Sequence, residues 1–327
     1  MKIVIAFHHP FVLWTAPAWF GDRLRADFPE HAVLQTSSYD DLGDAVSDAD
    51  ILLGWSIRPD QFARARRLQW IHSSAAAVHQ LMFPELINSP VVVSNSRSVH
   101  APVVAEHALA LVFALAKRLP QCRDYQHSAT WAQQAIFEEK PTVRELRDST
   151  VCLIGLGSIG REFSQRARAL GMRVIAVREH PEKGTGDADQ VFGRDQLNHA
   201  LSLADFVVLA APLTTATHHI INAASLAAMR PHSYLINVGR GPLIDDSDLV
   251  SALREKRIAG AALDVFAEEP LPASSPYWQM KNVLITPHIA AVSDKLWERQ
   301  YALISENLKR FLAHQPLQGI VDKSKGY

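Results

Sequence analysis

The sequence has little cysteine and little net charge. Its 327 residues contain two cysteines, Cys122 and Cys152, which are too few for a disulfide framework. Cys152 lies in an apolar run, where cysteine typically serves as a small buried hydrophobe. We therefore expect a reducing compartment, the cytoplasm. The formal net charge is −1, so composition gives no reason to expect binding to nucleic acid or to an anionic membrane.

Long hydrophobic runs are also lacking. The longest, VVAEHALALVFALA (103–116), contains Glu106 and His107 and is shorter than the roughly 20 residues that span a bilayer. It predicts a buried helix near 101–119. The apolar run at the start, MKIVIAF, ends at His8 and is too short for the core of an export signal. A first strand is the better interpretation, and no membrane partner is expected.

Short apolar runs are abundant, and they alternate with polar segments that carry charges at helical spacing. Strands alternating with helices imply a parallel sheet covered on both faces. Five predicted strands fall in the first hundred residues: KIVIAF, AVLQT, ILLGW, LQWIHS and VVVSN. A second, more regular series begins at Val151 and contains VCLIGLG, RVIAVR, ADFVVLAAP, SYLINVGR, GAALDVF and NVLITPH.

The second series predicts a complete doubly wound unit that ends near His288, followed by one long amphipathic helix. The simplest arrangement returns this last helix to the first domain. We therefore predict a dinucleotide-binding (Rossmann) domain, residues 100–288, inserted into a doubly wound substrate-binding domain of residues 1–99 and 289–327.

The run VCLIGLGSIG (151–160) carries the spacing Gly-x-Gly-x-x-Gly between a predicted strand and a predicted helix. In such a turn Gly155 permits the tight bend, Gly157 lets the backbone approach a pyrophosphate, and Gly160 allows close helix–strand packing. Backbone N–H groups at Ser158 and Ile159 would meet the phosphate charge. The context favours dinucleotide binding over a purely structural turn.

The end of the second strand of this unit indicates which dinucleotide binds. An acidic residue there accepts hydrogen bonds from the ribose hydroxyls of NAD and repels a 2′-phosphate. Here the residue is Arg178, whose guanidinium can grip a phosphate with two donors. Glu179, the next residue, could serve NAD instead. The pattern favours NADP and leaves NAD open.

Three segments each follow a strand of this unit: NVGRG (237–241), DVFAEEP (264–270) and TPHIA (286–290). With RELRDSTVCLIGLGSIGRE, APLTTATHHII and PLPASSPYWQMKNVLITPHIA, their order closely resembles the D-2-hydroxyacid dehydrogenases, which include glyoxylate and hydroxypyruvate reductases. The resemblance covers nearly the whole chain. It implies a Rossmann domain inserted into a flavodoxin-like substrate domain, both of class α/β with parallel sheets.

The resemblance assigns Arg240 to substrate binding, His288 to acid–base catalysis, and Glu269 to orienting that histidine. The chemistry agrees. A planar guanidinium can donate to both the carboxylate and the ketone oxygen of a 2-oxo acid. Histidine titrates near neutrality, and a carboxylate on its other ring nitrogen fixes the tautomer.

The resemblance also places Asp264 at the nicotinamide carboxamide and Pro212 in a loop that lines the cofactor. It assigns the substrate carboxylate to backbone N–H groups in WIHSSAAAVHQ (70–80), at Ala75, Ala76 and Ala77. Ala77 stands where relatives have glycine, and Ala290 and Ala291 stand where many have two glycines. The adjacent pairs His8–His9 and His218–His219 lack metal-ligand spacing, so no metal is expected.

These observations predict an NADP(H)-dependent reductase of small 2-oxo acids, with glyoxylate or hydroxypyruvate favoured. Two alternatives remain open: an NAD-dependent dehydrogenase working towards oxidation, and a dinucleotide-sensing binding protein like the corepressors that share the fold. The apolar helix near 101–119 would bury well against a second copy, so a homodimer is expected.

Overall fold

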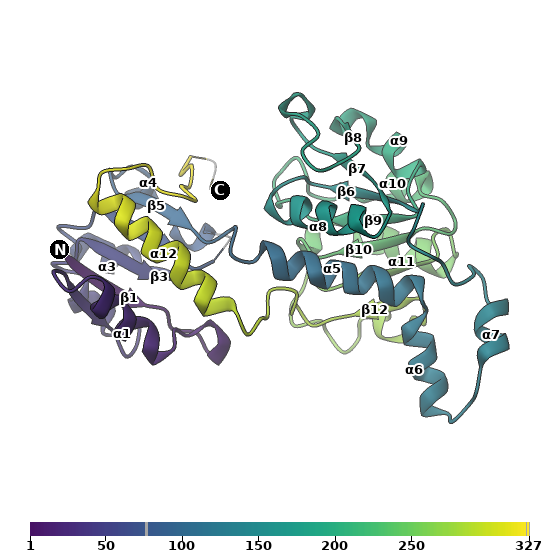
Figure 1. Ribbon diagram of the computed structural model, residues 1–327, viewed down its shortest axis with the longest axis horizontal. Helices are drawn as coiled ribbons and strands as arrows, with labels where there is room; N and C mark the ends of the chain where they lie inside the picture. The colour runs from purple at the N-terminus through teal and green to yellow at the C-terminus, as the bar shows by residue number, and fades with distance from the viewer. Residues whose placement is uncertain (76–77, 325, 327) are drawn as a thin grey trace. The chain divides into compact units, whose positions relative to one another are not determined.

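A computed structural model describes residues 1–75, 78–324 and 326 of the chain (Figure 1). The chain divides into two compact units, Met1–His100 with Val292–Tyr327, and Ala101–Ala291. In sequence, the second unit is inserted into the first. The predicted boundaries, 99/100 and 288/289, and the assignment of substrate and dinucleotide to these units stay predictions.

The first unit contains a five-stranded parallel sheet in the order β2-β1-β3-β4-β5. This is the flavodoxin-like order, which the sequence analysis expected. All residues of β3 and β4 are buried, as strands covered on both faces require. The strands are β1 (Lys2–Ala6), β2 (Ala32–Gln35), β3 (Ile51–Gly54), β4 (Trp70–Ser73) and β5 (Val92–Asn95).

Helices cover both faces of this sheet. Apolar side chains of α1 (Ala18–Asp27) and α12 (Leu296–Leu312) join one core cluster, and those of α2 (Leu42–Ala45) and α4 (Pro84–Ile87) join another, with α3 (Pro59–Arg64) packed beside α2. The predicted C-terminal amphipathic helix is thus α12, and it packs on the first unit.

The second unit contains a seven-stranded parallel sheet in the order β12-β11-β10-β9-β6-β7-β8. The order reverses between β6 and β9, as in a Rossmann fold, and ligands bind beyond the carboxyl ends of the strands at such a point. The strands are β6 (Thr150–Ile154), β7 (Arg173–Val177), β8 (Gln190–Phe192), β9 (Phe206–Leu209), β10 (Tyr234–Asn237), β11 (Gly260–Leu263) and β12 (Val283–Ile285).

One face of this sheet packs against α5 (Ala101–Ala116) and α8 (Ser158–Ala169), and the other against α9 (Leu197–Ser202), α10 (Ala223–Ala228) and α11 (Asp246–Arg254). Nine of the 16 residues of α5 are buried, which confirms the predicted buried helix, although it ends at Ala116. Among the described residues, no helix is both long enough and apolar enough to cross a membrane.

Three elements of the second unit were not predicted from the sequence. They are the short edge strand β8, α6 (Leu119–His127) and α7 (Gln133–Glu138). Neither α6 nor α7 contributes a buried residue, and both project from the sheet without covering either face (Figure 1). Neither helix therefore has a buried apolar stripe.

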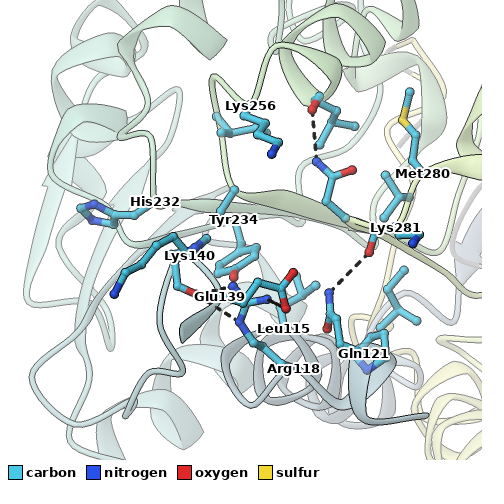
Figure 2. Close-up of a pocket in the computed structure, with 18 of the residues that line it drawn as sticks. Leu115, Arg118, Gln121, Glu139, Lys140, His232, Tyr234, Lys256, Met280 and Lys281 are labelled. Atoms are coloured by element: carbon cyan, nitrogen blue, oxygen red, sulfur yellow. Dashed lines mark hydrogen bonds and ion pairs between the residues drawn. The ribbon is translucent and has the colours of Figure 1, made fainter. Parts of the chain in front are cut away.

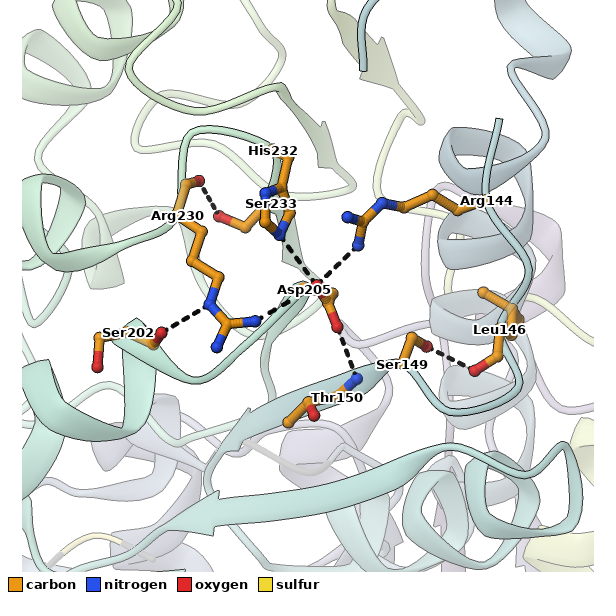
Figure 3. A network of polar contacts seen from close by, with 9 residues as sticks. All are labelled: Arg144, Leu146, Ser149, Thr150, Ser202, Asp205, Arg230, His232 and Ser233. Atoms are coloured by element: carbon orange, nitrogen blue, oxygen red, sulfur yellow. Dashed lines mark hydrogen bonds and ion pairs between the residues drawn. The ribbon is translucent and has the colours of Figure 1, made fainter. Parts of the chain in front are cut away.

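Asp205 joins three segments at the amino edge of the seven-stranded sheet (Figure 3). One carboxylate oxygen accepts from Arg144 Nη1 at 2.7 Å and from His232 Nε2 at 3.0 Å, and the other accepts from the Thr150 N–H at 2.8 Å. Burial acts to raise the pKa of Asp205, but the Thr150 N–H and the Arg144 guanidinium outweigh it, so the pKa lies below its usual range.

We predict that Asp205→Asn lowers the free energy of unfolding by about 1–3 kcal/mol near neutral pH, because it weakens a partly buried, charged hydrogen-bond network. Because the pKa of Asp205 is lower in the folded than in the unfolded protein, its ionised form stabilises the fold. This stabilisation is fully present above the unfolded-state pKa, about 3.9, and is lost as the pH falls through the folded-state pKa. Urea unfolding at pH 7 and near pH 3 measures both effects.

The gap between wild type and Asp205→Asn should therefore shrink on acidification. Asp124→Asn on α6 is the control, since Asp124 is exposed and forms no ion pair among the described residues. If the free energies of unfolding of wild type and Asp205→Asn differ by the same amount at both pH values, the lowered pKa of Asp205 is contradicted.

Candidate active site

The carboxyl ends of β10, β11 and β12 carry the residues predicted to do the chemistry. These strands are neighbours and parallel, so the loops that follow them leave the same edge of the sheet. Arg240 lies three residues after β10, Asp264 directly after β11, and His288 three residues after β12. Residues that are far apart in the sequence therefore lie at the same edge of the sheet.

His288 and Glu269 form a close pair. His288 Nδ1 lies 2.5 Å from Glu269 Oε2, and the second carboxylate oxygen accepts from the Phe266 N–H at 2.9 Å. The carboxylate is therefore held by its own loop while it orients the imidazole. The His288 side chain is half exposed, at 50%, and its Nε2 forms no hydrogen bond with another described residue. Glu268 is exposed and has no ion pair among the described residues.

The backbone of His288 is left-handed, with φ of +53°, a conformation that costs energy for a residue other than glycine. Its N–H donates to the Asp264 carbonyl at 2.9 Å. The Asp264 carboxylate accepts from Thr286 Oγ1 at 2.6 Å and from the N–H groups of Ile289 and Ala290, each at 3.0 Å. These bonds surround His288 on both sides and hold it in the strained conformation.

Asp264 is fully buried. Burial acts to raise its pKa, but hydrogen bonds from His107, Thr286 and the loop N–H groups outweigh it, and the pKa lies below its usual range. The carboxylate is therefore ionised and committed to the loop at residues 286–290. Its predicted contact with the nicotinamide carboxamide stays a prediction, and the observed bonds give it a second role.

Arg240 is exposed, and its Nη1 donates to the Gly239 carbonyl at 2.7 Å. It forms no ion pair with another described residue, so most of its guanidinium donors are available. The loop that carries Arg240 touches the loop that carries Glu269, since a Cβ built on Gly241 would lie 1.9 Å from the Phe266 carbonyl carbon. The structure gives no direct contact between Arg240 and His288.

The glycine turn lies between β6 and α8. Gly155 has φ of +101°, and a Cβ there would lie 2.8 Å from the Ala211 backbone, so only glycine fits. A Cβ on Gly160 would lie 2.4 Å from the Gly155 carbonyl oxygen, which shows how closely the helix approaches the turn. Gly157 faces open space. Gly157 and Ser158 are exposed and Ile159 half-buried, leaving the N-terminus of α8 accessible.

Arg178 and Pro212 follow other strands of the same sheet. Arg178 comes directly after β7 and is half-buried; its Nη1 donates weakly to the Gly184 carbonyl at 3.4 Å. Glu179 is exposed. Pro212 lies in the loop after β9, where its carbonyl accepts from Thr217 Oγ1 at 2.7 Å. All of these positions lie on the carboxyl side of the sheet.

The predicted carboxylate-binding loop follows β4 in the first unit. Ala75 is half-buried, and its N–H donates to Ser73 Oγ at 3.3 Å; Ala76 and Ala77 lie outside the described residues. A buried polar chain supports this loop. His72 Nε2 lies 2.9 Å from Ser96 Oγ, which donates to Gln300 Oε1 at 2.6 Å, and Gln300 Nε2 donates to the Ser74 carbonyl at 2.8 Å.

Comparison with known proteins identifies the family. Residues 109–290 match the sequence profile described as D-isomer specific 2-hydroxyacid dehydrogenase, NAD binding domain. A relative named glyoxylate reductase, from Pyrococcus furiosus, is 32% identical over 273 residues, which is 81% of this chain and 80% of that protein. The chain belongs to the D-isomer specific 2-hydroxyacid dehydrogenases.

Solved structures of members agree with this assignment. A family protein from Aeromonas salmonicida has a TM-score of 0.83 at 29% identity, covering 98% of this chain and 99% of that one. A dehydrogenase from Xanthobacter autotrophicus, in complex with NADPH, has a TM-score of 0.82 at 27% identity and covers 100% of this chain and 99% of that one. The family resemblance, the fold class and the prediction of an oxidoreductase are thereby confirmed.

Sequence reasoning assigned no site role to two residues of this dehydrogenase. His107 Nε2 lies 3.1 Å from Thr286 Oγ1 and 3.4 Å from Asp264 Oδ1. A polar residue inside the apolar run of α5 was the available signal for His107, and the TPHIA segment was the signal for Thr286. Among the described residues, no group of three or more His, Cys, Asp or Glu side chains could hold a metal ion.

We predict that Asp264→Asn lowers both turnover and stability, the latter by about 1–3 kcal/mol, because an amide presents one acceptor oxygen where four donors converge. Assays of 2-oxo acid reduction and urea unfolding measure the two effects. Asp248→Asn is a matched control, since Asp248 accepts a single N–H, from Ala223, outside the His288 loop. Normal turnover in Asp264→Asn rules out a positioning role for Asp264.

Proposed function

We propose that this dehydrogenase is an NADP(H)-dependent reductase of small 2-oxo acids, with Arg240, Glu269 and His288 as its catalytic group. The observation that carries the proposal is the His288–Glu269 pair at the carboxyl edge of the sheet, beside the loop that presents Arg240. Glyoxylate and hydroxypyruvate are the proposed substrates, in keeping with the relative named glyoxylate reductase. The cytoplasm remains the proposed location.

The residues around the glycine turn fit a dinucleotide. Gly157 leaves open space at the start of α8, and the first N–H groups of a helix have no intrahelical acceptor. The positive end of the helix dipole adds to this attraction for a phosphate. When bound, NADPH supplies the hydride that reduces the ketone carbon. Pro212 and Asp264 are proposed to line its nicotinamide end.

A single cation, Arg240, is proposed to hold the substrate. The planar Arg240 fork can donate to the carboxylate and to the ketone oxygen together, which aligns the ketone carbon. Binding of the carboxylate by backbone N–H groups at Ala75, Ala76 and Ala77 remains a prediction from the family resemblance, and Ala76 and Ala77 lie outside the described residues. The Arg240 guanidinium would also stabilise the negative charge that develops on the ketone oxygen during reduction.

His288 supplies the proton. With Glu269 on Nδ1, the proton to be transferred sits on Nε2, and the carboxylate stabilises the imidazolium. As the carbon gains hydride, the ketone oxygen takes the Nε2 proton, which gives the 2-hydroxy acid. In the reverse direction the neutral imidazole accepts the hydroxyl proton at the same atom. One pair therefore serves both directions.

His288→Ala should reduce turnover with glyoxylate or hydroxypyruvate by about 10²–10⁴-fold, because the general acid is lost, and should leave the dissociation constant of NADPH unchanged. Steady-state kinetics and fluorescence titration of NADPH measure these. His314→Ala is a matched control, since His314 also has a left-handed backbone, with φ of +54°. Near-normal turnover in His288→Ala refutes the assignment.

The choice of cofactor depends on Arg178. We expect a higher kcat/KM with NADPH than with NADH, and Arg178→Ala should cut the NADPH value by about 10–100-fold, because a charge-assisted bond to the 2′-phosphate is lost. The NADH value should change little. Arg173→Ala, at the opposite end of β7, is the control. If the enzyme instead prefers NADH, and Arg178→Ala leaves kcat/KM with NADPH unchanged, Glu179 and not Arg178 contacts the adenosine ribose.

A homodimer is the proposed assembly, although α5 buries most of its apolar residues in its own unit. Better support comes from exposed apolar side chains on α5 and the projecting segment: Phe113 at 37%, Trp131 at 92% and Phe137 at 68% exposure. A symmetric partner would cover such side chains. Light scattering should give twice the chain mass of 36.3 kDa, and Trp131→Ser/Phe137→Ser should shift it towards the monomer. A monomeric wild type would exclude the dimer.

A further inference from the structure

His107 lies in the second turn of α5, a helix that is otherwise almost entirely apolar. Glu106 and His107 are the two titratable residues among the 16 of α5. Glu106 is exposed, whereas the His107 side chain is only 17% exposed and lies beside the buried carboxylate of Asp264. Burying a polar group costs free energy unless it forms hydrogen bonds, so the contacts of this imidazole indicate what it does.

The His107 imidazole contacts two residues of the candidate site. Its Nε2 lies 3.1 Å from Thr286 Oγ1 and 3.4 Å from Asp264 Oδ1. The Thr286 hydroxyl donates its single hydrogen to Asp264 at 2.6 Å, and an ionised carboxylate can only accept. Nε2 of His107 therefore carries the hydrogen in this contact and donates it. Within the described part of the chain, His107 is the one basic side chain within 4.0 Å of the Asp264 carboxylate.

The bonds of Asp264 connect this contact to His288. The Asp264 carbonyl accepts from the His288 N–H, and its carboxylate accepts from the N–H groups of Ile289 and Ala290. A carboxylate held only by the loop at residues 286–290 could move together with that loop. His107 supplies a donor from a different element, α5, which packs against β10 and β11. The imidazole therefore ties the carboxylate to the helix and sheet behind the loop.

This arrangement is complete within the second unit. His107, Asp264 and His288 all belong to Ala101–Ala291, so the contact needs no residue of the first unit. Helix α5 also carries Phe113, one of the exposed side chains that the proposed homodimer would cover. His107 makes its contacts inside its own unit and needs no free surface, so its role is compatible with that assembly.

We propose that His107 is a positioning residue for the reduction step. By fixing the Asp264 carboxylate, it keeps the loop at residues 286–290 in the conformation that presents the His288 imidazole. The inference rests on the proposed role of His288 as the general acid. Because a misplaced general acid slows the chemical step, loss of His107 should lower kcat. It should leave KM for the 2-oxo acid and the dissociation constant of NADPH nearly unchanged.

Two substitutions separate the hydrogen bond of His107 from its packing. His107→Leu keeps a side chain of similar size and removes the donor, whereas His107→Gln can place an amide N–H where Nε2 lies. His107→Leu should lower kcat with glyoxylate by about 10–100-fold, because a hydrogen bond to a charged group is lost, and His107→Gln should recover kcat to within about threefold of wild type. If His107→Leu does not fold, His107→Asn replaces it, since the shorter amide does not reach the position of Nε2.

Hydrogen exchange of the loop gives a second readout that does not depend on turnover. The N–H groups of Ile289 and Ala290 are held by Asp264, and local opening sets the rate at which such groups exchange. In His107→Leu, the peptide that covers residues 286–291 should exchange about tenfold faster than in wild type. In His107→Gln it should exchange at close to the wild-type rate. Mass spectrometry of protease digests measures these rates.

His232 provides a matched control at the amino edge of the same sheet, two residues before the start of β10 (Figure 2). Its Nε2 lies 3.0 Å from Asp205 Oδ1, so His232→Leu also removes a contact between a histidine and a carboxylate. This variant should unfold at a lower urea concentration than wild type. It should leave kcat and the exchange of residues 286–291 unchanged.

Three results overturn the inference: a wild-type kcat in His107→Leu, an equal loss of kcat in His232→Leu, or unchanged exchange of residues 286–291 in His107→Leu. Failure of the proposed function gives a different result. In that case wild type does not reduce 2-oxo acids, or His288→Ala keeps normal turnover. The exchange rates would then still show whether His107 fixes the loop.

Discussion

The parallel pairing of β10, β11 and β12 is the constraint on which the candidate site depends. Because these strands run side by side in one direction, the loops after them must leave the same edge. Arg240, Asp264 with Glu269, and His288 each come from a different one of these loops. The sheet therefore brings the proposed catalytic residues to one edge, and each loop needs to supply only one or two side chains.

Within that frame, the loop around His288 is held against its own conformational preference. A left-handed histidine costs energy, and the loop offsets this cost through hydrogen bonds to Asp264. His107 reaches the same cluster from α5. Glu269 is fixed in turn by the Phe266 N–H. The imidazole is thus held by residues of its own unit.

The sequence predicted those features that follow from local pattern. Apolar segments of five to nine residues predicted eleven of the twelve strands in the described part of the chain. The glycine spacing located the turn at Gly155, because a positive φ leaves few alternatives to glycine. Strand β8, with three residues at the sheet edge, is too short to give a pattern. Helices α6 and α7 bury no side chains in their unit, so no apolar stripe marks them.

Long-range contacts could not be predicted in the same way. His107 and Asp264 are far apart in sequence, and so are His72, Ser96 and Gln300, and only the folded chain brings each set together. The resemblance to a known family supplied Glu269 in preference to Glu268, which pattern alone could not separate.

Glu269 is proposed to act through His288. A double-mutant cycle tests it most directly, with kcat/KM for 2-oxo acid reduction measured for wild type, Glu269→Ala, His288→Ala and the double variant. If Glu269 works only by orienting and charging the imidazole, the double variant will be no slower than His288→Ala alone. Losses that multiply in the double variant would show that the two residues act independently and would contradict this account.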